Sequence, residues 1–297
     1  MTDYPLVFDI KRGSLDNGLG IRTTVFLKGC YLSCIWCHNP ESMKPDKEIS
    51  FKYKRCIMCG ECERICPKGA IQLYSRERID RNVCNACGIC ARQCCSMAIE
   101  EIGRYYPVED LLAILMRDKL FYDTSGGGVT LSGGEPMYHM DYVGELIRQL
   151  KDNGIHTAIQ TSGYFDLDSF RMKILPYLDL IYFDLKFIDA KLHRRYTGRD
   201  NSRILDNFLW LVDESNIPVI PCIPLIPSIT ATIENLTEIA AFIKKAGCTD
   251  YKFSEYNPLG LSKRNFLDKG LHQEMPSYFL TTEEELGWKH YFKEAIE

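Results

Sequence analysis

The sequence lacks three features that would each point to a broad class of protein. Among its 297 residues no apolar run approaches membrane-spanning length, which argues against a membrane protein. There is no excess of basic side chains, because the formal net charge is -4, and this argues against a nucleic-acid-binding surface. The start, Met1-Thr-Asp-Tyr-Pro, has neither a basic segment nor an apolar stretch, so we predict a cytoplasmic protein without a signal peptide.

Cysteine is what the chain has in quantity, with 14 residues, of which eleven fall into three spaced sets. A disulfide framework is not expected without a signal peptide, so these thiols indicate a protein of reducing conditions. The first set is Cys30-x3-Cys34-x2-Cys37. It supplies three thiolates to an iron-sulfur cluster that needs four ligands, so one iron is left open for another molecule. We expect the chemistry at that open iron.

The second and third sets repeat one four-cysteine pattern at an interval of 28 residues. Three cysteines at x2 spacing and a fourth after x3 match the two-cluster ferredoxins, in which the fourth cysteine binds the other cluster. Structural zinc is the alternative, but zinc sites use two well-separated pairs. Cys95 stands where the pattern has proline; it is a spare thiol or a competing ligand, and spacing favours the first. The predicted sets are Cys56, Cys59, Cys62 and Cys94 for one cluster, and Cys66, Cys84, Cys87 and Cys90 for the other.

After residue 104, short β-branched or apolar runs alternate with longer amphipathic stretches. This alternation is typical of an α/β fold with a parallel sheet, and six units predict a partial (β/α)6 barrel. We predict the domains 1–49 with 102–297 for the barrel, and 50–101 for a ferredoxin-like insert. The expected strands are 22–28, 128–132, 156–161, 180–185, 218–223 and 250–256, and the expected helices are 107–119, 140–153, 166–175, 203–214 and 233–246.

Functional groups in such sheets gather at the carboxyl ends of the strands. The three-cysteine loop follows the first strand, and polar or glycine-rich segments follow the next three. We therefore expect these segments to converge on one rim. The residues after Asn257 have weak periodicity and allow no prediction. The three segments are Gly133-Gly134-Glu135-Pro136, Thr161-Ser162-Gly163 and Asp184-Leu185-Lys186.

Several motifs together carry a family resemblance over about residues 8 to 263. They are Cys30-x3-Cys-x2-Cys-His-Asn-Pro-Glu-Ser, Gly126-Gly-Gly-Val-Thr-Leu-Ser-Gly-Gly-Glu-Pro136, Asp184-Leu-Lys186, Asp16-Asn-Gly-Leu-Gly-Ile-Arg, His193-x3-Tyr-Thr-Gly198 and Ile223-Pro-Leu-Ile-Pro227. In this combination the chain resembles the radical S-adenosylmethionine (SAM) enzymes. More narrowly, it is similar to the glycyl-radical-enzyme activating enzymes that carry a two-cluster ferredoxin insert.

The resemblance implies cofactors, partners and a reaction. The cofactors are three 4Fe-4S clusters and SAM, and the partners are a glycyl radical enzyme and an electron donor such as ferredoxin or flavodoxin. One electron cleaves SAM into methionine and a 5'-deoxyadenosyl radical, which takes a hydrogen atom from a glycine of the partner enzyme. No catalytic side chain is expected beyond the cluster and SAM. By resemblance, the SAM-binding residues are Trp36, Cys37, His38, Gly133, Gly134, Asp184, Leu185, Lys186 and Asn257.

Two of these motifs leave a question open. Glu135 either supports its loop or only caps the helix that follows. Side chains alternate along a strand, so we expect that Asp184 and Lys186 cannot both face one pocket unless the strand has already turned.

Several family positions are altered. Gln160 replaces an acidic residue, which puts the monovalent-cation site of relatives in doubt. The other departures are Cys222 for an arginine, Ser228 and Ala231 for Gly and Asp in the following turn, and Asn257 for a histidine. Two other functions remain open: a radical enzyme acting on a small molecule or peptide, and an electron-transfer iron-sulfur protein.

Overall fold

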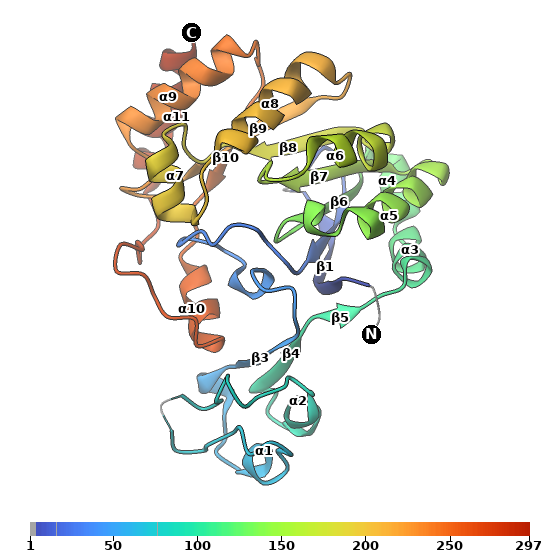
Figure 1. Ribbon diagram of the computed structural model, residues 1–297, viewed down its shortest axis with the longest axis vertical. Coiled ribbons are helices and arrows are strands. Elements are labelled where there is room, and N and C mark those ends of the chain that lie inside the picture. Colours follow the sequence, from blue (N-terminus) through green and yellow to red (C-terminus); the bar gives the residue numbers. More distant parts are fainter. Residues whose placement is uncertain (1–3, 16, 76) are drawn as a thin grey trace.

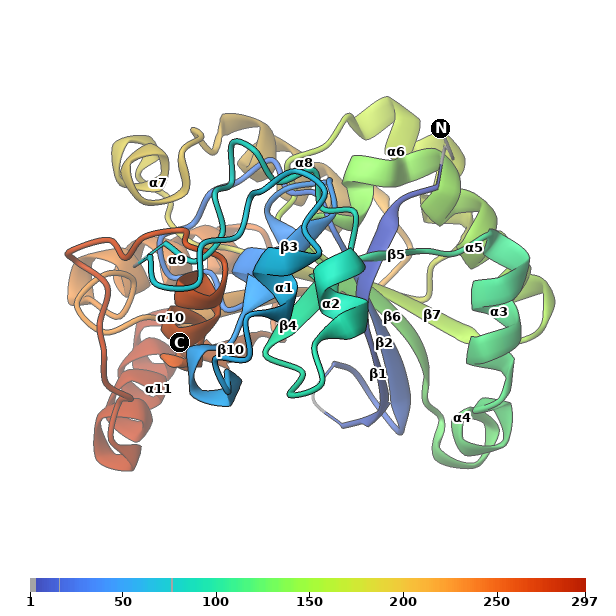
Figure 2. The ribbon, with the colours of Figure 1, turned by 90° about the horizontal axis from the view of Figure 1, so that it is seen from below.

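We describe the chain from a computed structural model, which covers residues 4–15, 17–75 and 77–297. Within these residues an eight-stranded sheet has the strand order β10-β9-β8-β7-β6-β2-β1-β5 (Figures 1 and 2). Six neighbouring strands run parallel, and they are the six predicted from the sequence. The α/β fold with a largely parallel sheet is therefore confirmed. These strands are β2 (Arg22–Leu27), β6 (Gly128–Gly133), β7 (His156–Thr161), β8 (Leu180–Asp184), β9 (Val219–Leu225) and β10 (Lys252–Glu255).

Two further strands, β1 (Leu6–Ser14) and β5 (Arg104–Tyr105), extend the sheet beyond β2 and were not predicted. Both are antiparallel to their neighbours. The pairing of β1 with β2 has two register shifts, so β1 does not keep a regular alternation of buried and exposed side chains. Without that period-2 pattern a strand leaves little signal in its sequence.

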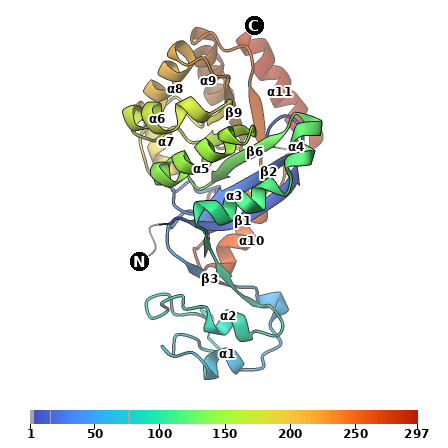
Figure 3. The same cartoon turned by 90° about the vertical axis from the view of Figure 1, so that its right-hand side faces the viewer.

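The five predicted helices all form, and α5, α6 and α8 lie together on one face of the sheet (Figure 3). Two of the five begin at side-chain caps: Asp166 accepts from Ser169 N at the start of α6, and Thr232 accepts from Asn235 N at the start of α9. Two helices, α4 (Lys119–Ser125) and α7 (Ala190–Thr197), were not predicted. The five are α3 (Val108–Met116), α5 (Met140–Asp152), α6 (Leu167–Lys173), α8 (Ser202–Glu214) and α9 (Ile233–Lys245).

The two faces of the parallel sheet differ in chemistry. On β8, Ile181 and Phe183 are fully buried in the main hydrophobic core, together with apolar side chains of the helices. Tyr182 and Asp184 alternate with them and are only partly buried. The face away from the helices is thus partly polar, and this is the face on which the cavity described below is found.

The segment between β3 (Glu48–Phe51) and β4 (Ile99–Ile102) forms a small lobe that projects from the sheet (Figures 1 and 3). β3 and β4 pair antiparallel at its base, and the lobe carries the short helices α1 (Glu61–Arg64) and α2 (Ile89–Gln93). The predicted limits of the insert, at residues 50 and 101, fall within this strand pair. The lobe has a hydrophobic core of its own, made of Ile49, Phe51, Ile71, Ile79, Cys90, Ala98 and Ile99.

Two helices occupy the segment after Asn257 for which the sequence allowed no prediction: α10 (Leu259–Phe266) and α11 (Thr282–Ile296). α11 begins at a capping box made by Thr281 and Glu284, and its fully buried Phe292 belongs to the main core. That Thr-x-x-Glu signal is visible in the sequence and could have located α11. Over the described ranges, none of the helices has both the length and the apolar character needed to cross a membrane.

Candidate active site

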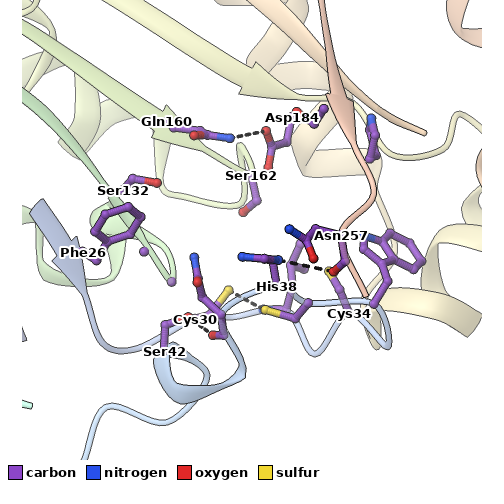
Figure 4. A pocket seen from close by; sticks show the side chains of 18 of the residues that line it. Phe26, Cys30, Cys34, His38, Ser42, Ser132, Gln160, Ser162, Asp184 and Asn257 are labelled. Carbon is purple, nitrogen blue, oxygen red and sulfur yellow. Dashed lines mark hydrogen bonds between the residues drawn. The ribbon is translucent and has the colours of Figure 1, made fainter. Parts of the chain in front are cut away.

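A cavity of about 510 Å³ lies at the carboxyl ends of the parallel strands (Figure 4). The structure brings together there the loops that follow β2, β6, β7 and β8. In Figure 4, Gln160, Ser162 and Asp184 face Cys30, Cys34 and His38 across the cavity. The lining includes all the predicted SAM-binding residues except Leu185: Trp36, Cys37, His38, Gly133, Gly134, Asp184, Lys186 and Asn257, together with Cys30 and Cys34.

The three-cysteine loop is held by backbone hydrogen bonds at both sides. Gly29, with φ of +101°, donates from N to Ser42 O at 2.7 Å. On the other side, Ser33 N donates to Thr197 O at 2.8 Å and Ile35 N to Tyr196 O at 3.1 Å, which ties the loop to the last turn of α7. The loop that carries the thiols is therefore fixed by the fold rather than by a metal alone.

The thiols of this loop are protonated unless a positive charge comes close. Burial raises the pKa of Cys34 to about 12, against the opposing effect of the Lys186 ammonium. Burial also raises the pKa of Cys37. Because metal binding displaces thiol protons, this donor set fits a cationic metal centre that would supply the missing positive charge.

The glycines after β6 allow two chain segments to pass at close range. A Cβ on Gly134 would lie 2.2 Å from Gly29 O, and one on Gly133 would lie 2.4 Å from Leu27 N. Gly133 also has a φ of +108°, which disfavours other residues. Both backbone units therefore border the cavity without a side chain in the way.

Glu135 does both of the things that the sequence left open. Its buried carboxylate accepts hydrogen bonds from Thr161 Oγ1 at 2.7 Å and from Ser162 N and Oγ at 2.8 and 2.6 Å. It also accepts from Met137 N at 3.1 Å, which caps the short helix that begins at Pro136. Burial raises the pKa of Glu135 while these hydrogen bonds lower it. The carboxylate thus joins the loops after β6 and β7.

The expectation that Asp184 and Lys186 could not both face one pocket is wrong. Residues two apart on a strand lie on the same side, and Lys186 Nζ donates to Asp184 Oδ2 at 2.9 Å. Leu185, between them, points the other way and is buried in the main core, so it does not line the cavity. Gln160 Nε2 donates to the second oxygen of Asp184 at 3.3 Å. Burial lowers the pKa of Lys186, but Asp184 and the nearby thiols of Cys34 and Cys30 together raise it above its ordinary value, so the ammonium stays charged.

Trp36, His38 and Asn257 also line the cavity. Trp36 is buried against Phe187 and Tyr196, with ring centroids 6.0 and 6.2 Å away. His38 Nδ1 lies 3.4 Å from the backbone oxygen of Asn257, and burial lowers the pKa of this imidazole. The side-chain oxygen of Asn257 accepts from Leu259 N at 2.9 Å, at the start of α10.

Three of the altered family positions do not line the cavity. Cys222 is buried beside Asp184 in the sheet register but does not line the cavity. Ser228 has a φ of +58°, so the turn after β9 keeps the backbone shape that favours glycine although glycine is absent. Ala231 is buried in the main core. Asp16 lies outside the described residues, and its neighbour Asn17 lines the cavity.

Eight of the nine cysteines of the small lobe line two separate small cavities, and Cys95 lines neither. The fourth cysteine of each run crosses to the other cavity, as the ferredoxin pattern predicts. One cavity contains Cys66, Cys84, Cys87 and Cys90, and the other Cys56, Cys59, Cys62 and Cys94.

The backbone of the lobe repeats at the same interval as its cysteines. Positive φ angles recur in the pairs Met58 and Ala86, Gly60 and Gly88, and Gly69 and Met97, each 28 residues apart. Within the described residues, no three His, Cys, Asp or Glu side chains are grouped so as to hold a single metal ion. The repeat places four thiols at each of the two lobe cavities.

Some cavity-lining residues had no signal in the sequence. Asp9 and Lys11 of β1 reach the cavity because β1 adds to the sheet next to β2. Lys263 lines it from α10, in the segment of weak periodicity, and its Nζ donates to Asn39 Oδ1 at 2.9 Å. These residues arrive through tertiary packing, which single-sequence patterns do not encode.

Comparisons with known proteins agree with this geometry. The sequence profile of the radical SAM superfamily matches residues 24–243. The chain is 39% identical over 271 residues to the isethionate sulfite-lyase activating enzyme of Desulfovibrio desulfuricans, covering 89% of this chain and 86% of that protein. It is 40% identical over 207 residues to the trans-4-hydroxy-L-proline dehydratase activating enzyme of Clostridioides difficile, covering 68% of each.

Among solved structures, a radical SAM methyltransferase from Sphaerobacter thermophilus resembles the chain with a TM-score of 0.55. The likeness covers 98% of this chain and 75% of that one at 13% identity. At this level of identity it supports the fold alone.

Proposed function

The chain belongs to the radical SAM superfamily and, within it, to the glycyl-radical-enzyme activating enzymes, and on that basis we propose how its cavity and its three thiol sets divide the reaction. We assign SAM to the cavity at the strand ends, electron supply to the small lobe, and a glycine of a protein partner to the open side of the cavity. The sheet then forms a partial (β/α)6 barrel around SAM.

The observation that carries this proposal is the cavity itself, which collects three thiols, a bare glycine backbone and an ion pair in one place. Cys30, Cys34 and Cys37 would hold a 4Fe-4S cluster with one iron open. When bound, that cluster supplies the one electron that cleaves SAM into methionine and a 5'-deoxyadenosyl radical, which becomes 5'-deoxyadenosine by taking a hydrogen atom from glycine.

The chain's own residues would bind and orient SAM. Gly133 and Gly134 leave backbone groups accessible to its amino group. The ion pair with Asp184 fixes the position of the Lys186 ammonium, which would bind the carboxylate of SAM. Trp36, His38 and Asn257 provide the apolar and polar wall suited to an adenosyl group. Glu135 keeps the loops after β6 and β7 at a constant separation, which favours a single binding geometry.

We assign no monovalent cation to this site. The two oxygens of Asp184 already accept from Lys186 Nζ and Gln160 Nε2, so two donors take the places where a cation could bind. An amide donor at residue 160 serves the same carboxylate without adding charge. SAM cleavage is then expected to proceed at the same rate in sodium, potassium and large organic cations.

The partner's glycine would enter from the side of β1. The cavity extends to Asp9 and Lys11, whose side chains are exposed, so this end is in contact with solvent. A glycine in a protein loop needs such an opening, because the reacting carbon must come close to the adenosyl group. The relatives' names record lyases and dehydratases as targets, and we propose that this partner is likewise a glycyl radical enzyme.

The small lobe would hold two further 4Fe-4S clusters that pass electrons inward from a ferredoxin or flavodoxin. Each has four thiols, so no iron is open to a ligand. Their order follows from β3, which starts at Glu48 against the barrel residue Lys28. Ile49 lines the cavity of Cys66, Cys84, Cys87 and Cys90, and Phe51 at the end of β3 lines the other. The first is the inner cluster, consistent with α2 lying nearer the sheet than α1 (Figures 1 and 3).

The proposal is tested by following the hydrogen atom. The reconstituted chain is incubated anaerobically with SAM, a strong reductant and a candidate partner deuterated at the α-carbons of glycine. We expect deuterium in the 5'-deoxyadenosine by mass spectrometry and a carbon-centred radical on the partner by electron paramagnetic resonance (EPR). Deuterium that arrives only from a labelled small metabolite, with no radical on any partner, would favour the small-molecule enzyme instead. Absence of deoxyadenosine would leave only an electron-transfer protein.

A further inference from the structure

Helix α10 packs directly on the three-cysteine loop, between the main sheet and the small lobe (Figures 1 and 3). At Gly260 the two backbones are so close that a Cβ would lie 2.9 Å from Cys37 O and 3.2 Å from His38 Cα. One turn further along the helix, Arg264 Nη2 donates to Cys34 O at 2.8 Å. Arg264 thus contacts the backbone of the segment that carries two of the three thiols.

Arg264 is a buried cation without a carboxylate partner in the described part of the chain. The residue is 8% exposed, and its Nε is buried and donates to no acceptor there. An arginine keeps its proton in proteins, so the guanidinium cannot become neutral to escape burial. An unpaired buried charge is strongly unfavourable. Burial of the Arg264 guanidinium therefore stays unfavourable until an anion binds near it.

Three lysines around the loop are each paired with a carboxylate. Lys28 pairs with Glu48 at 2.8 Å, Lys186 with Asp184 at 2.9 Å and Lys263 with Glu41 at 2.9 Å. Arg264 differs from all three in having only a carbonyl oxygen as its partner. Unlike the exposed Arg199, which also donates to a carbonyl oxygen of the loop, Arg264 is buried, so its charge is little screened by solvent and acts on a negatively charged group held by the loop.

We propose that Arg264 is a positioning residue whose fixed charge raises the reduction potential of the cluster held by Cys30, Cys34 and Cys37. This inference rests on the proposed function, which places that cluster in the loop. One-electron reduction adds a negative charge to the cluster, and a nearby buried cation stabilises the reduced form more than the oxidised form. Reduction is the step that precedes SAM cleavage, so Arg264 makes the cluster accessible to its donor.

Two substitutions separate charge from hydrogen bonding. Arg264→Gln keeps a polar amide but loses the charge, while Arg264→Lys keeps the charge on a side chain of similar length. The readout is an EPR-monitored potentiometric titration of the reconstituted full-length chain, following the cluster signal that changes when SAM is added. We expect Arg264→Gln to lower the potential by about 59 mV or more, a tenfold smaller ratio of reduced to oxidised cluster. Arg264→Lys should stay close to the wild type.

Arg195→Gln is the matched control, because it removes an exposed arginine that is paired with Glu274, and it should leave the potential unchanged. If Arg264→Gln keeps the SAM-responsive signal at the wild-type potential, the inference is wrong and the proposed function stands. If the wild-type chain shows no SAM-responsive cluster, the proposed function itself fails.

A second measurement covers the case in which Arg264→Gln does not assemble its cluster. In the cluster-free chain the guanidinium has no anion to compensate it, so Arg264→Gln should melt at the same or a higher temperature than the wild type. A clearly lower melting temperature in the cluster-free state would show that Arg264 only holds the loop, and would overturn the electrostatic role. Loss of the cluster in both Arg264→Gln and Arg264→Lys would do the same.

Discussion

The three-cysteine loop and the small lobe present the same ligand atom in different surroundings. The loop faces a cavity with polar walls, where Gln160, Ser162, Asp184 and Lys186 lie opposite the thiols. The two cavities of the lobe are bordered by apolar residues such as Ile71 and Leu73. The three-cysteine loop lacks a fourth thiol and faces a polar wall, as expected of a cluster that binds a ligand. Each lobe cavity has four thiols, as expected of a cluster that only transfers electrons.

The two regions also contact each other. Arg81 of the lobe donates to Asp268 just after α10, at 2.7 Å from Nη2, and Tyr53 donates to the same carboxylate at 3.3 Å. Lys28 and Lys269 both bind Glu48 at the base of β3. Since α10 also packs on the three-cysteine loop, one helix touches both kinds of site, and the predictions below ask how far they act independently.

The largest expected effect separates ligand binding from electron supply. Cys34→Ala removes a thiol of the open cluster, so SAM cleavage should fall to background with any reductant. Cys59→Ala damages only the lobe, so cleavage should be lost with a protein donor but largely restored by a strong chemical reductant. Deoxyadenosine formation measures both. Equal loss in the two variants, with the protein still folded, would mean that the lobe does more than carry electrons.

A smaller effect is expected from the cation on the cavity wall. Lys186→Met removes a charged donor and leaves the Asp184 carboxylate without its ion pair. Charge-assisted hydrogen bonds contribute about 1.5 to 3 kcal/mol, so SAM should bind roughly 10- to 100-fold more weakly. Equilibrium binding measures this, while EPR should show the lobe clusters unchanged. Lys191→Met, on the exposed side of α7, is the control and should bind SAM normally.

Much of this site could be predicted because the spacing of the cysteines can be read directly from the sequence, without knowledge of the tertiary structure. The exchange of Cys66 and Cys94 between the two cavities of the lobe is an example. The six parallel strands were also predictable, since they combine apolar runs with regular spacing.

What could not be predicted depends on packing between distant segments. Arg264 reaches Cys34 across 230 residues of sequence, and no local pattern marks it. β1 has register shifts that remove its alternation. The wrong expectation for Asp184 and Lys186 had another cause. It misapplied the strand period, which places residues two apart on one side.

The regions should also differ in their response to acid, because the lobe, residues 50–101, contains no histidine whereas α7 carries a buried one. Burial lowers the pKa of His193 to about 4, and its Nδ1 lies 2.7 Å from Arg199 O. Below the unfolded pKa of about 6.5, protonation then favours the unfolded chain. The stability that this neutral histidine contributes should be present above that pKa and decrease by about 2 kcal/mol between pH 7.5 and pH 5.

His193→Gln should remove that part of the pH dependence. The measurement is urea denaturation of both proteins at several pH values, compared as a difference so that shared contributions cancel. Parallel curves for the wild type and the variant would show that His193 does not titrate between the folded and unfolded states, and that α7 holds the three-cysteine loop without acid sensitivity.

The smallest change, a threefold one in metal content, tests the comparison between the regions directly. Three 4Fe-4S clusters correspond to about 12 irons per chain after anaerobic reconstitution. Replacing Cys56 and Cys84 together by serine takes one thiol from each lobe cavity, so iron should fall to about four. The remaining iron should still respond to SAM by EPR, because the lobe has its own hydrophobic core and its cavities are separate from the main one.

Zinc in place of the missing iron in the wild type would contradict the cluster assignment. A double variant that loses all twelve irons would show that the three-cysteine loop cannot keep its cluster without an intact lobe, and that the contact through α10 makes the two regions a single unit.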